Sequence, residues 1–209
     1  MKMPKFEELP FNIRPDLSKY LIHLTKKSFE DDNITAFKNL VSILKKGKIR
    51  GSDSKNGFIK GSNKATCFMD VPLSSLKYVL DSHNSCSINP RYEPFGILIT
   101  KKFGYKKGCR PVLYLSDNEL KALKIPHEEK WRVVKLEVDG DKWISWIHER
   151  EWRCKNNLKL SKNPPTVFVK NTKYAKKLQK MINKNPNKFR VKPKSIIPLN
   201  VICEGLPYL

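Results

Sequence analysis

The sequence predicts an α+β chain that folds as a single compact domain on mixed, strongly twisted sheets. Short apolar or alternating segments typical of strands are mixed irregularly with segments of helical spacing. The regular strand–helix alternation of a doubly wound parallel sheet is therefore missing. Neither of the glycine-rich fingerprints GxGxxG and GxxxxGKS/T occurs. The 209 residues are 39% hydrophobic, which is enough for one core of this kind.

The first half of the chain is expected to begin with an irregular arm over residues 1–18, which is rich in proline, so the domain is assigned to residues 19–209. A helix at 34–47 is predicted from apolar residues at helical spacing and from Gly47, which is placed to cap its C-terminus. The elements expected in this half are a strand at 19–25, the helix at 34–47, a polar loop at 48–64, a strand at 65–73, a helix at 74–83 and a strand at 95–103.

The second half is expected to be richer in strands. A helix at 171–184 is predicted because Tyr174, Leu178 and Ile182 lie on one face and lysines on the other. The elements expected in this half are strands at 110–116, 131–139, 143–154 and 166–170, helices at 118–125 and 171–184, and a closing strand at 195–203.

Charge is the strongest compositional signal. Lys and Arg number 42 against 20 Asp and Glu, a formal net charge of +22, and no acidic residue occurs from Arg153 to Lys194. A field of this sign attracts polyanions, of which nucleic acid is the commonest inside cells. A nucleotide bias toward lysine codons would give the same excess, so charge alone does not establish a nucleic-acid partner.

Cysteine and histidine usage argues against a structural metal site. The five cysteines form no CxxC pair, and the four histidines supply no closely spaced ligands, so no metal is expected. The N-terminus has no apolar signal core, and no apolar run approaches the roughly 20 residues that a membrane span needs. We therefore expect reduced thiols, no membrane partner and a cytoplasmic protein.

Ionisable residues interrupt the apolar segment ISWIHEREWRC at 144–154. On one continuous strand, Glu149, Glu151 and Arg153 would share a face, and two carboxylates there repel each other unless a cation or a substrate lies between them. The alternative is a buried ion-pair cluster. His23, Thr25 and Asp70 also lie in expected strands, either for a functional reason or with satisfied structural hydrogen bonds.

The order of these motifs resembles that of a known group. LIHLT, FKNLVSILKKGKIRGS, TCFMDVPLSSL, YEPFGILITKKF and EREWR follow one another much as in abortive-infection proteins of the AbiGi type. More distantly, the chain is similar to the DarT family of nucleic-acid ADP-ribosyltransferases, over most of residues 19–182. The resemblance implies an ADP-ribosyltransferase-like fold with NAD as the substrate.

Carried over residue by residue, the resemblance assigns four binding residues. His23 and Thr25 would contact the nicotinamide-ribose side of NAD, and Phe68 would line the nicotinamide pocket. Arg50, in the loop after the helix, would bind the pyrophosphate. Arg153 would also serve in NAD binding, because guanidinium groups bind phosphates in forked geometry. A further arginine motif of DarT-like enzymes has no counterpart that can be located in this chain.

The catalytic carboxylate implied by the resemblance is Glu149 or Glu151. The ExE spacing of the broader transferase group favours the second, whereas the DarT-like register favours the first. Cleavage of the bond between nicotinamide and ribose passes through an oxocarbenium-like state, which a nearby carboxylate stabilises. The second carboxylate would take a proton from the acceptor nucleophile.

The sequence thus predicts an NAD-dependent mono-ADP-ribosyltransferase, a toxin or antiphage effector that modifies DNA or RNA and that an antitoxin or other neutralising partner protein could oppose. Trp143, Trp146 and Trp152 would either stack on bases or lie in the core. One alternative is a magnesium-dependent nuclease, in which Asp139 or Asp141 combines with EREWR. The other is a non-enzymatic module that binds nucleic acid or a partner protein.

Overall fold

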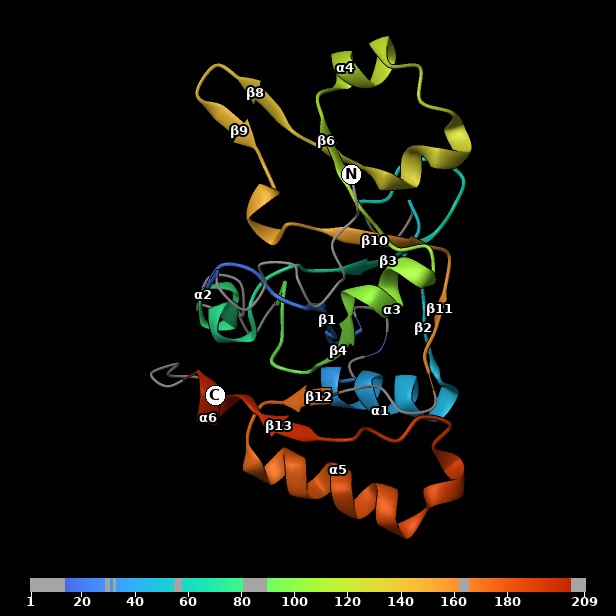
Figure 1. Ribbon diagram of the computed structural model, residues 1–209, viewed down its shortest axis with the longest axis vertical. Helices are drawn as coiled ribbons and strands as arrows, with labels where there is room; N and C mark the ends of the chain where they lie inside the picture. Colours follow the sequence, from blue (N-terminus) through green and yellow to red (C-terminus); the bar gives the residue numbers. More distant parts are fainter. Residues whose placement is uncertain are drawn as a thin grey trace, which may run out of the picture. The chain divides into compact units, whose positions relative to one another are not determined.

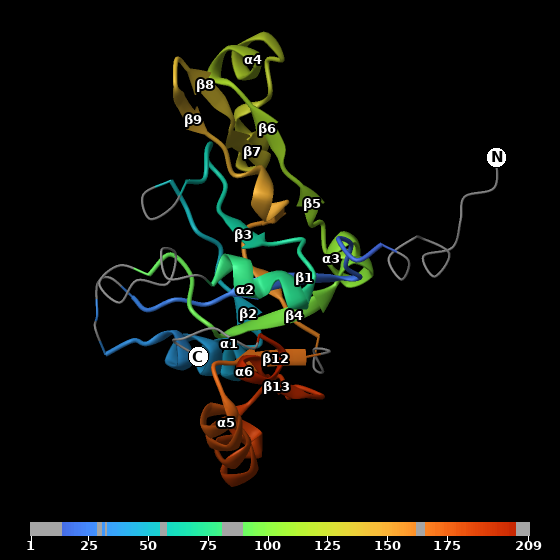
Figure 2. The same ribbon diagram turned by 90° about the vertical axis from the view of Figure 1, so that its left-hand side faces the viewer.

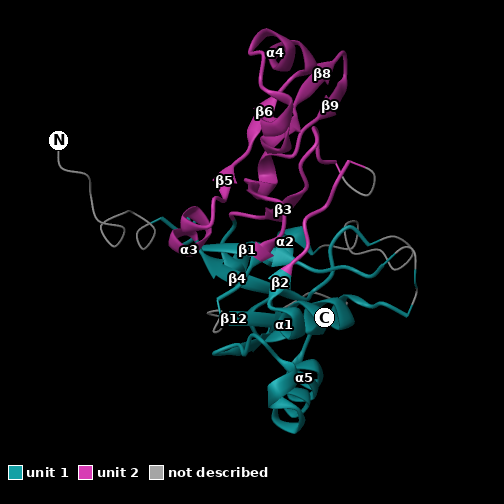
Figure 3. Cartoon of the chain, turned by 90° about the vertical axis from the view of Figure 1, so that its right-hand side faces the viewer, with its two compact units in different colours: residues 1–48, 71–100, 159–209 teal, residues 49–70, 101–158 magenta. Residues whose placement is uncertain are grey.

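The structure is a computed structural model that describes residues 14–28, 31, 33–54, 58–80, 90–161 and 166–203. The chain divides into two compact units (Figure 3). Unit 1 comprises residues 1–48, 71–100 and 159–209, and unit 2 comprises residues 49–70 and 101–158. The assignment of 19–209 to one domain stays a prediction. Residues 1–13 of the expected arm lie outside the described residues.

Unit 1 is built on a four-stranded mixed sheet of order β1-β4-β12-β13. These strands are β1 (Tyr20–Leu24), β4 (Gly96–Thr100), β12 (Thr166–Val169) and β13 (Ile196–Pro198). β4 pairs antiparallel with both β1 and β12, whereas β12 and β13 are parallel. The apolar run Ile97–Ile99 is buried, as expected for a strand with neighbours on both edges. The expected mixture of helices with mixed sheets is therefore confirmed.

Glycine is required at the start of β4. A Cβ atom on Gly96 would lie 2.3 Å from the carbonyl oxygen of His23 on β1 and 2.4 Å from the Phe168 ring on β12. Both distances are far below van der Waals contact, so only a residue without a side chain allows the three strands to approach this closely.

The two long helices of unit 1 agree with the sequence prediction. Helix α1 (Ala36–Lys46) ends at Gly47, whose left-handed φ of 63° lets its N–H donate to the Ile43 carbonyl. Helix α5 (Thr172–Lys184) lies alongside β12 and β13 (Figures 1 and 2). The rings of Phe37 on α1 and Tyr174 on α5 are 5.0 Å apart between centroids, so the two helices contact each other. The shorter helices of unit 1 are η3 (Leu73–Ser75), α2 (Leu76–Val79), η6 (Pro186–Lys188) and α6 (Leu199–Ile202).

Unit 2 contains shorter strands. A three-stranded antiparallel sheet of order β3-β10-β5 consists of β3 (Ala65–Phe68), β10 (Trp152–Lys155) and β5 (Arg110–Pro111). The parallel pair is β6 (Leu113–Leu115) with β7 (Val133–Lys135), and the hairpin is β8 (Glu137–Asp139) with β9 (Lys142–Ile144). The helices of unit 2 are α3 (Lys101–Lys106), α4 (Asp117–Ala122), η4 (His127–Arg132) and η5 (Ile147–Glu149). The two-residue strands β2 (Lys48–Ile49) and β11 (Leu158–Lys159) pair with each other in a separate two-stranded sheet.

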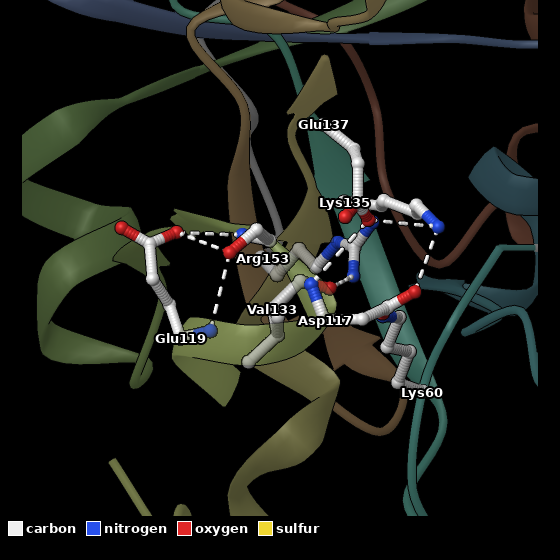
Figure 4. Close-up of polar contacts among 8 residues, drawn as sticks. Lys60, Asp117, Glu119, Val133, Lys135, Glu137 and Arg153 are labelled. Atoms are coloured by element: carbon white, nitrogen blue, oxygen red, sulfur yellow. Dashed lines mark hydrogen bonds and ion pairs between the residues drawn. The ribbon is translucent and has the colours of Figure 1, made fainter. Parts of the chain in front are cut away.

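Helix α4, predicted at 118–125, begins with a capping box. The Ser116 hydroxyl accepts from the Glu119 N–H at 3.1 Å, and the Glu119 carboxylate accepts from the Ser116 N–H at 2.8 Å. The first helical residue, Asp117, pairs with Lys60 at 2.9 Å and with Lys135 at 2.7 Å (Figure 4). These contacts connect the start of the helix to β7 and to the 58–64 segment.

Several predicted strands end earlier than expected. The strand predicted at 95–103 stops at Thr100, after which Lys101–Lys106 is helical. The stretch 110–116 is divided between two sheets, and 131–139 begins as the 3-10 helix η4. The closing strand at 195–203 ends at Pro198, which precedes the helical turn α6. In these segments the spacing of apolar residues alone does not mark the point where the backbone changes conformation.

The polar loop at 48–64 contributes to the core, contrary to expectation. Ile59 is buried and packs in one cluster with Ala65 and Trp131. Four of the five cysteines are described, and all four are free thiols that are buried or half-buried; Cys86 lies outside the described residues. No helix in the described part of the chain has the length and apolar character to span a membrane.

Candidate active site

The segment 143–154 is not one strand. β9 ends at Ile144, a 3-10 turn occupies Ile147–Glu149, and β10 begins at Trp152. Between them Arg150 adopts a left-handed conformation with φ of 46°, which ends the 3-10 turn and is incompatible with a continuous strand. The prediction that Glu149 shares a strand face with Glu151 and Arg153 is therefore wrong for Glu149.

Glu151 and Arg153 do share a face, as alternation predicts. The guanidinium donates to both carboxylate oxygens, with Nε–Oε1 at 2.8 Å and Nη2–Oε2 at 3.1 Å. Its remaining nitrogen, Nη1, donates to the Trp131 carbonyl at 2.9 Å. The same nitrogen donates to the Val133 carbonyl at 3.2 Å, as Figure 4 shows. Glu151 is 7% exposed and Arg153 3%. The buried ion-pair alternative therefore holds for these two residues.

The charge of Arg153 is maintained inside the protein. Burial works to lower the pKa of its guanidinium, but the neighbouring Glu151 carboxylate and the Cys67 side chain more than offset this effect, and the net pKa is raised. Because the arginine stays charged and holds both oxygens, the Glu151 carboxylate has one fixed orientation.

Both glutamates act on the same neighbouring groups. Burial raises the pKa of the Cys67 thiol, and the charges of Glu151 and Glu149 raise it further. Burial also raises the pKa of Tyr114, again with contributions from both carboxylates. The Tyr114 hydroxyl accepts from the Glu151 N–H at 3.0 Å and donates to the Trp146 carbonyl at 3.3 Å. Although Glu149 is off the strand, the two carboxylates therefore share one region of unit 2.

Asp70 connects the two sides of the turn at Arg150. Its N–H donates to the Glu149 carbonyl at 3.2 Å, and its Oδ2 accepts from the Trp152 indole at 3.2 Å. Its other oxygen lies 2.8 Å from Lys101 Nζ and 3.7 Å from an Arg150 nitrogen. Asp70 and Lys101 are 8% and 7% exposed. This buried cluster fixes the backbone that carries Glu149.

Lys101 was missed by sequence reasoning because it was assigned to a strand. The signal that could have found it is a lysine directly after an apolar strand, where a buried amine requires a carboxylate partner. Asp70, at the end of another apolar strand, is that partner.

The other predicted residues of unit 2 differ in exposure. Phe68 is paired with Trp152 across β3 and β10 and is fully buried, so its ring belongs to the packing beneath the β10 segment. Arg50 directly follows β2 and is exposed.

His23 and Thr25 belong to unit 1. His23 is half-buried on β1, in register with Ile97 of β4. Thr25 is buried, and its hydroxyl lies 2.9 Å from the Ala36 carbonyl and 3.2 Å from that of Phe95. The hydrogen-bonded structural alternative therefore holds for the Thr25 hydroxyl. Within the described residues no group of three or more His, Cys, Asp and Glu side chains is arranged to hold a metal ion.

Comparison with known proteins gives two similarities. No protein-family model matches the chain. The chain is 39% identical over 71 residues to the abortive phage resistance protein AbiGi of Lactococcus lactis subsp. cremoris, a match that covers 34% of this chain. It spans only a quarter of the length of that curated relative, 25%.

Two solved structures are also similar, those of Thermus sp. 2.9 DarT in complex with NAD+ and with carba-NAD+. Each has a TM-score of 0.48 and 14% identity, and each match covers 87% of this chain and 96% of the other. The resemblance to an AbiGi protein inferred from the motifs is thus confirmed over the 71 matched residues.

Proposed function

We propose that the chain is an NAD-dependent mono-ADP-ribosyltransferase that acts as a toxin or antiphage effector, with DNA or RNA as the acceptor. The observation that carries the proposal is the pair of carboxylates, Glu149 and Glu151, which lie on either side of the turn at Arg150, with Glu151 bonded to the buried Arg153. They lie in the segment that matches the ExE motif of such transferases. The similarity to AbiGi supports the antiphage role.

The two carboxylates suit different steps. Glu151 is held in one orientation by Arg153, and each of its oxygens keeps acceptor capacity after that bond, so it would accept a ribose hydroxyl. Fixed negative charge at that position stabilises the oxocarbenium-like state more than the ground state. Glu149 is half-buried at the turn and more open to an incoming acceptor, whose proton it would take.

The contacts separate the proposed NAD-binding residues into those that can contact NAD and those that act within the protein. Arg50 is exposed and can bind the pyrophosphate through its guanidinium. Arg153 uses all three of its nitrogens within the protein, so we infer that it positions Glu151 and does not bind phosphate. Phe68 would act by packing. His23, which belongs to unit 1 and is half-buried, keeps its proposed role on the nicotinamide-ribose side, whereas the Thr25 hydroxyl is already bonded within unit 1.

The test is transfer of label from NAD carrying a tagged adenine to DNA and RNA oligonucleotides. We expect wild-type protein to label one of them and Glu149→Gln to reduce the rate by about 10²–10⁴-fold, the usual contribution of a general base. Glu128→Gln, which removes an exposed carboxylate elsewhere in unit 2, is the matched control and should keep full activity.

Glu149→Gln leaves the ion pair of Glu151 intact, so its loss of activity would not be a loss of folding. No consumption of NAD by wild-type protein, with or without nucleic acid, would end the proposal. Cleavage of the oligonucleotide that requires Mg²⁺ and ignores NAD would instead support the nuclease alternative.

A further inference from the structure

Unit 1 has two adjoining hollows on its surface, which meet at Lys45. The larger has a volume of about 890 Å³ and the smaller about 290 Å³. Together they form what we call the lysine groove, whose cationic lining residues are Lys45, Lys46, Lys48, Lys159, Lys177, Lys180, Lys184, Lys188 and Arg190. All of these residues belong to one compact unit.

The floor of the lysine groove is held in place by the backbone. The chain after η6 returns to the end of α1, where the Val191 N–H donates to the Leu44 carbonyl at 3.1 Å and the Leu160 N–H donates to the Gly47 carbonyl at 2.9 Å. Phe189 and Val191 are buried and anchor this crossing. Figure 1 shows the C-terminal ends of α1 and α5 on the same side of unit 1. The groove is therefore a formed surface.

The lysine groove has no internal charge compensation. Its lining among the described residues includes no Asp or Glu, and residues 152–203 of the sequence contain none at all. In the described part of the chain, no carboxylate forms an ion pair with any of the nine cations. Lys45 and Lys46 in the last turn of α1 are explained by the helix dipole. The other side chains add like charge, which costs free energy unless an anion is present.

The spacing suits a chain of phosphates. Lys177, Lys180 and Lys184 follow one face of α5, with rises of about 4.5 and 6 Å between successive residues. Lys188 continues the row beyond the end of the helix. A polymer with regularly spaced negative charges can lie along the whole lysine groove. A flat lipid surface would contact only the rims of the groove. The aromatic side chain in the lining, Phe189, is buried, so it offers no platform for base stacking.

We propose that the lysine groove is a docking site for the phosphate backbone of a nucleic acid, independent of base sequence. This proposal goes beyond the proposed function because it says where the backbone of the acceptor nucleic acid binds. The lysine groove contains none of the residues proposed for the transfer step. Binding at this surface needs no NAD and none of the glutamates.

The test is the binding of a fluorescent 20-nucleotide single strand to the full chain, measured by anisotropy without NAD between 50 and 200 mM salt. The groove variant replaces Lys177, Lys180, Lys184 and Lys188 with Gln. The control variant replaces four exposed lysines of the same unit outside the groove, Lys173, Lys176, Lys192 and Lys194, with Gln. Both variants remove the same charge.

We expect the groove variant to bind at least tenfold more weakly. The slope of log K against log salt should fall by about 0.7 for each phosphate that is no longer neutralised, or roughly 3 in total. The control variant should be weakened much less. If both variants lose the same affinity for the oligonucleotide, binding would depend only on the net positive charge of the protein, and the proposal would be overturned. Groove-dependent binding to vesicles of phosphatidylserine and phosphatidylcholine, without binding to the oligonucleotide, would overturn it in favour of a membrane surface.

The outcome is separable from that of the proposed function. Glu149→Gln should bind the oligonucleotide like the wild type. A protein that binds through the groove but never consumes NAD would refute the transferase and keep the docking site. If the groove variant labels and binds nucleic acid as well as the wild type does, the docking site would be refuted and the transferase would be kept.

Discussion

Glu151 and Arg153, two residues apart at the start of β10, form a two-point ion pair that is almost completely buried. Removing one partner leaves the other charged and without compensation inside the protein. We therefore expect Glu151→Gln to lower the free energy of unfolding by about 3–5 kcal/mol, measured by urea denaturation.

The double replacement of Glu151 and Arg153 by Met is the control. It removes both charges together but also the donor to the Trp131 and Val133 carbonyls, so it should be less destabilised than the single variant without reaching the stability of the wild type. If the single variant is destabilised by under about 1 kcal/mol, the pair is not buried as described.

Asp70 should be equally sensitive because Lys101, its partner, is buried with it. Asp70→Asn leaves the Lys101 amine without a carboxylate at 2.8 Å and weakens the acceptor of the Trp152 indole. The expected loss of stability is about 2–4 kcal/mol by thermal or urea unfolding. Asp53→Asn, which breaks a more exposed pair with Lys64, should cost about 1 kcal/mol or less. Similar losses of stability in both variants would contradict the burial of the Asp70 cluster.

Gly96→Ala should strongly destabilise unit 1. The added methyl would be 2.3 Å from the His23 carbonyl, and strand β1 would have to move away from β4. Because both close contacts are with the backbone or a buried ring, we expect a destabilisation of about 3 kcal/mol or more, at or above the upper end of the range for overpacked sites. Gly140→Ala has a positive φ of 55° but nothing within 4 Å, so it should show only the backbone cost of about 1–2 kcal/mol. A variant at 96 as stable as the one at 140 would contradict the strand spacing.

Asp117 should titrate unusually low. Its hydrogen bonds from Lys135 and Lys60 lower the carboxyl pKa from 3.8 to about 2. Because the folded pKa is below the unfolded one, the pairing stabilises the fold above about pH 3.8, and this contribution disappears as the pH falls through about 2. The chemical shift of the Asp117 carboxyl carbon, followed in an NMR titration, measures this pKa directly.

Lys135→Gln removes the larger of these two effects, so it should move the Asp117 midpoint back toward 3.8. A wild-type midpoint near the unperturbed value would show that the ion pairs at 2.7 and 2.9 Å do not persist in solution.

The helices were predictable because their signals are local. Gly47 ends α1 and Ser116 begins α4 through contacts within four residues of the sequence. The central part of each main strand was also predictable from apolar alternation. The strand order was not, because the paired strands β4 and β12 begin at Gly96 and Thr166, 70 residues apart, and no local pattern specifies that pairing.

At the site, alternation correctly placed Glu151 beside Arg153 and failed at Glu149. The left-handed conformation of Arg150 has no sequence signal, since arginine rarely adopts it. It is supported by tertiary contacts, among them the approach of an Arg150 nitrogen to Asp70, which lies 80 residues earlier in the chain. Those contacts depend on the fold and not on the neighbouring residues.

The order of the segments along the chain bears on synthesis by the ribosome. Every residue of unit 2 has been made once position 158 is reached, but β12 and β13 of unit 1 come later. Until then one edge of β4 has no partner strand, and its apolar run is open to pairing with other nascent chains. The growing polypeptide thus passes through a stage in which protection by a chaperone would be most valuable.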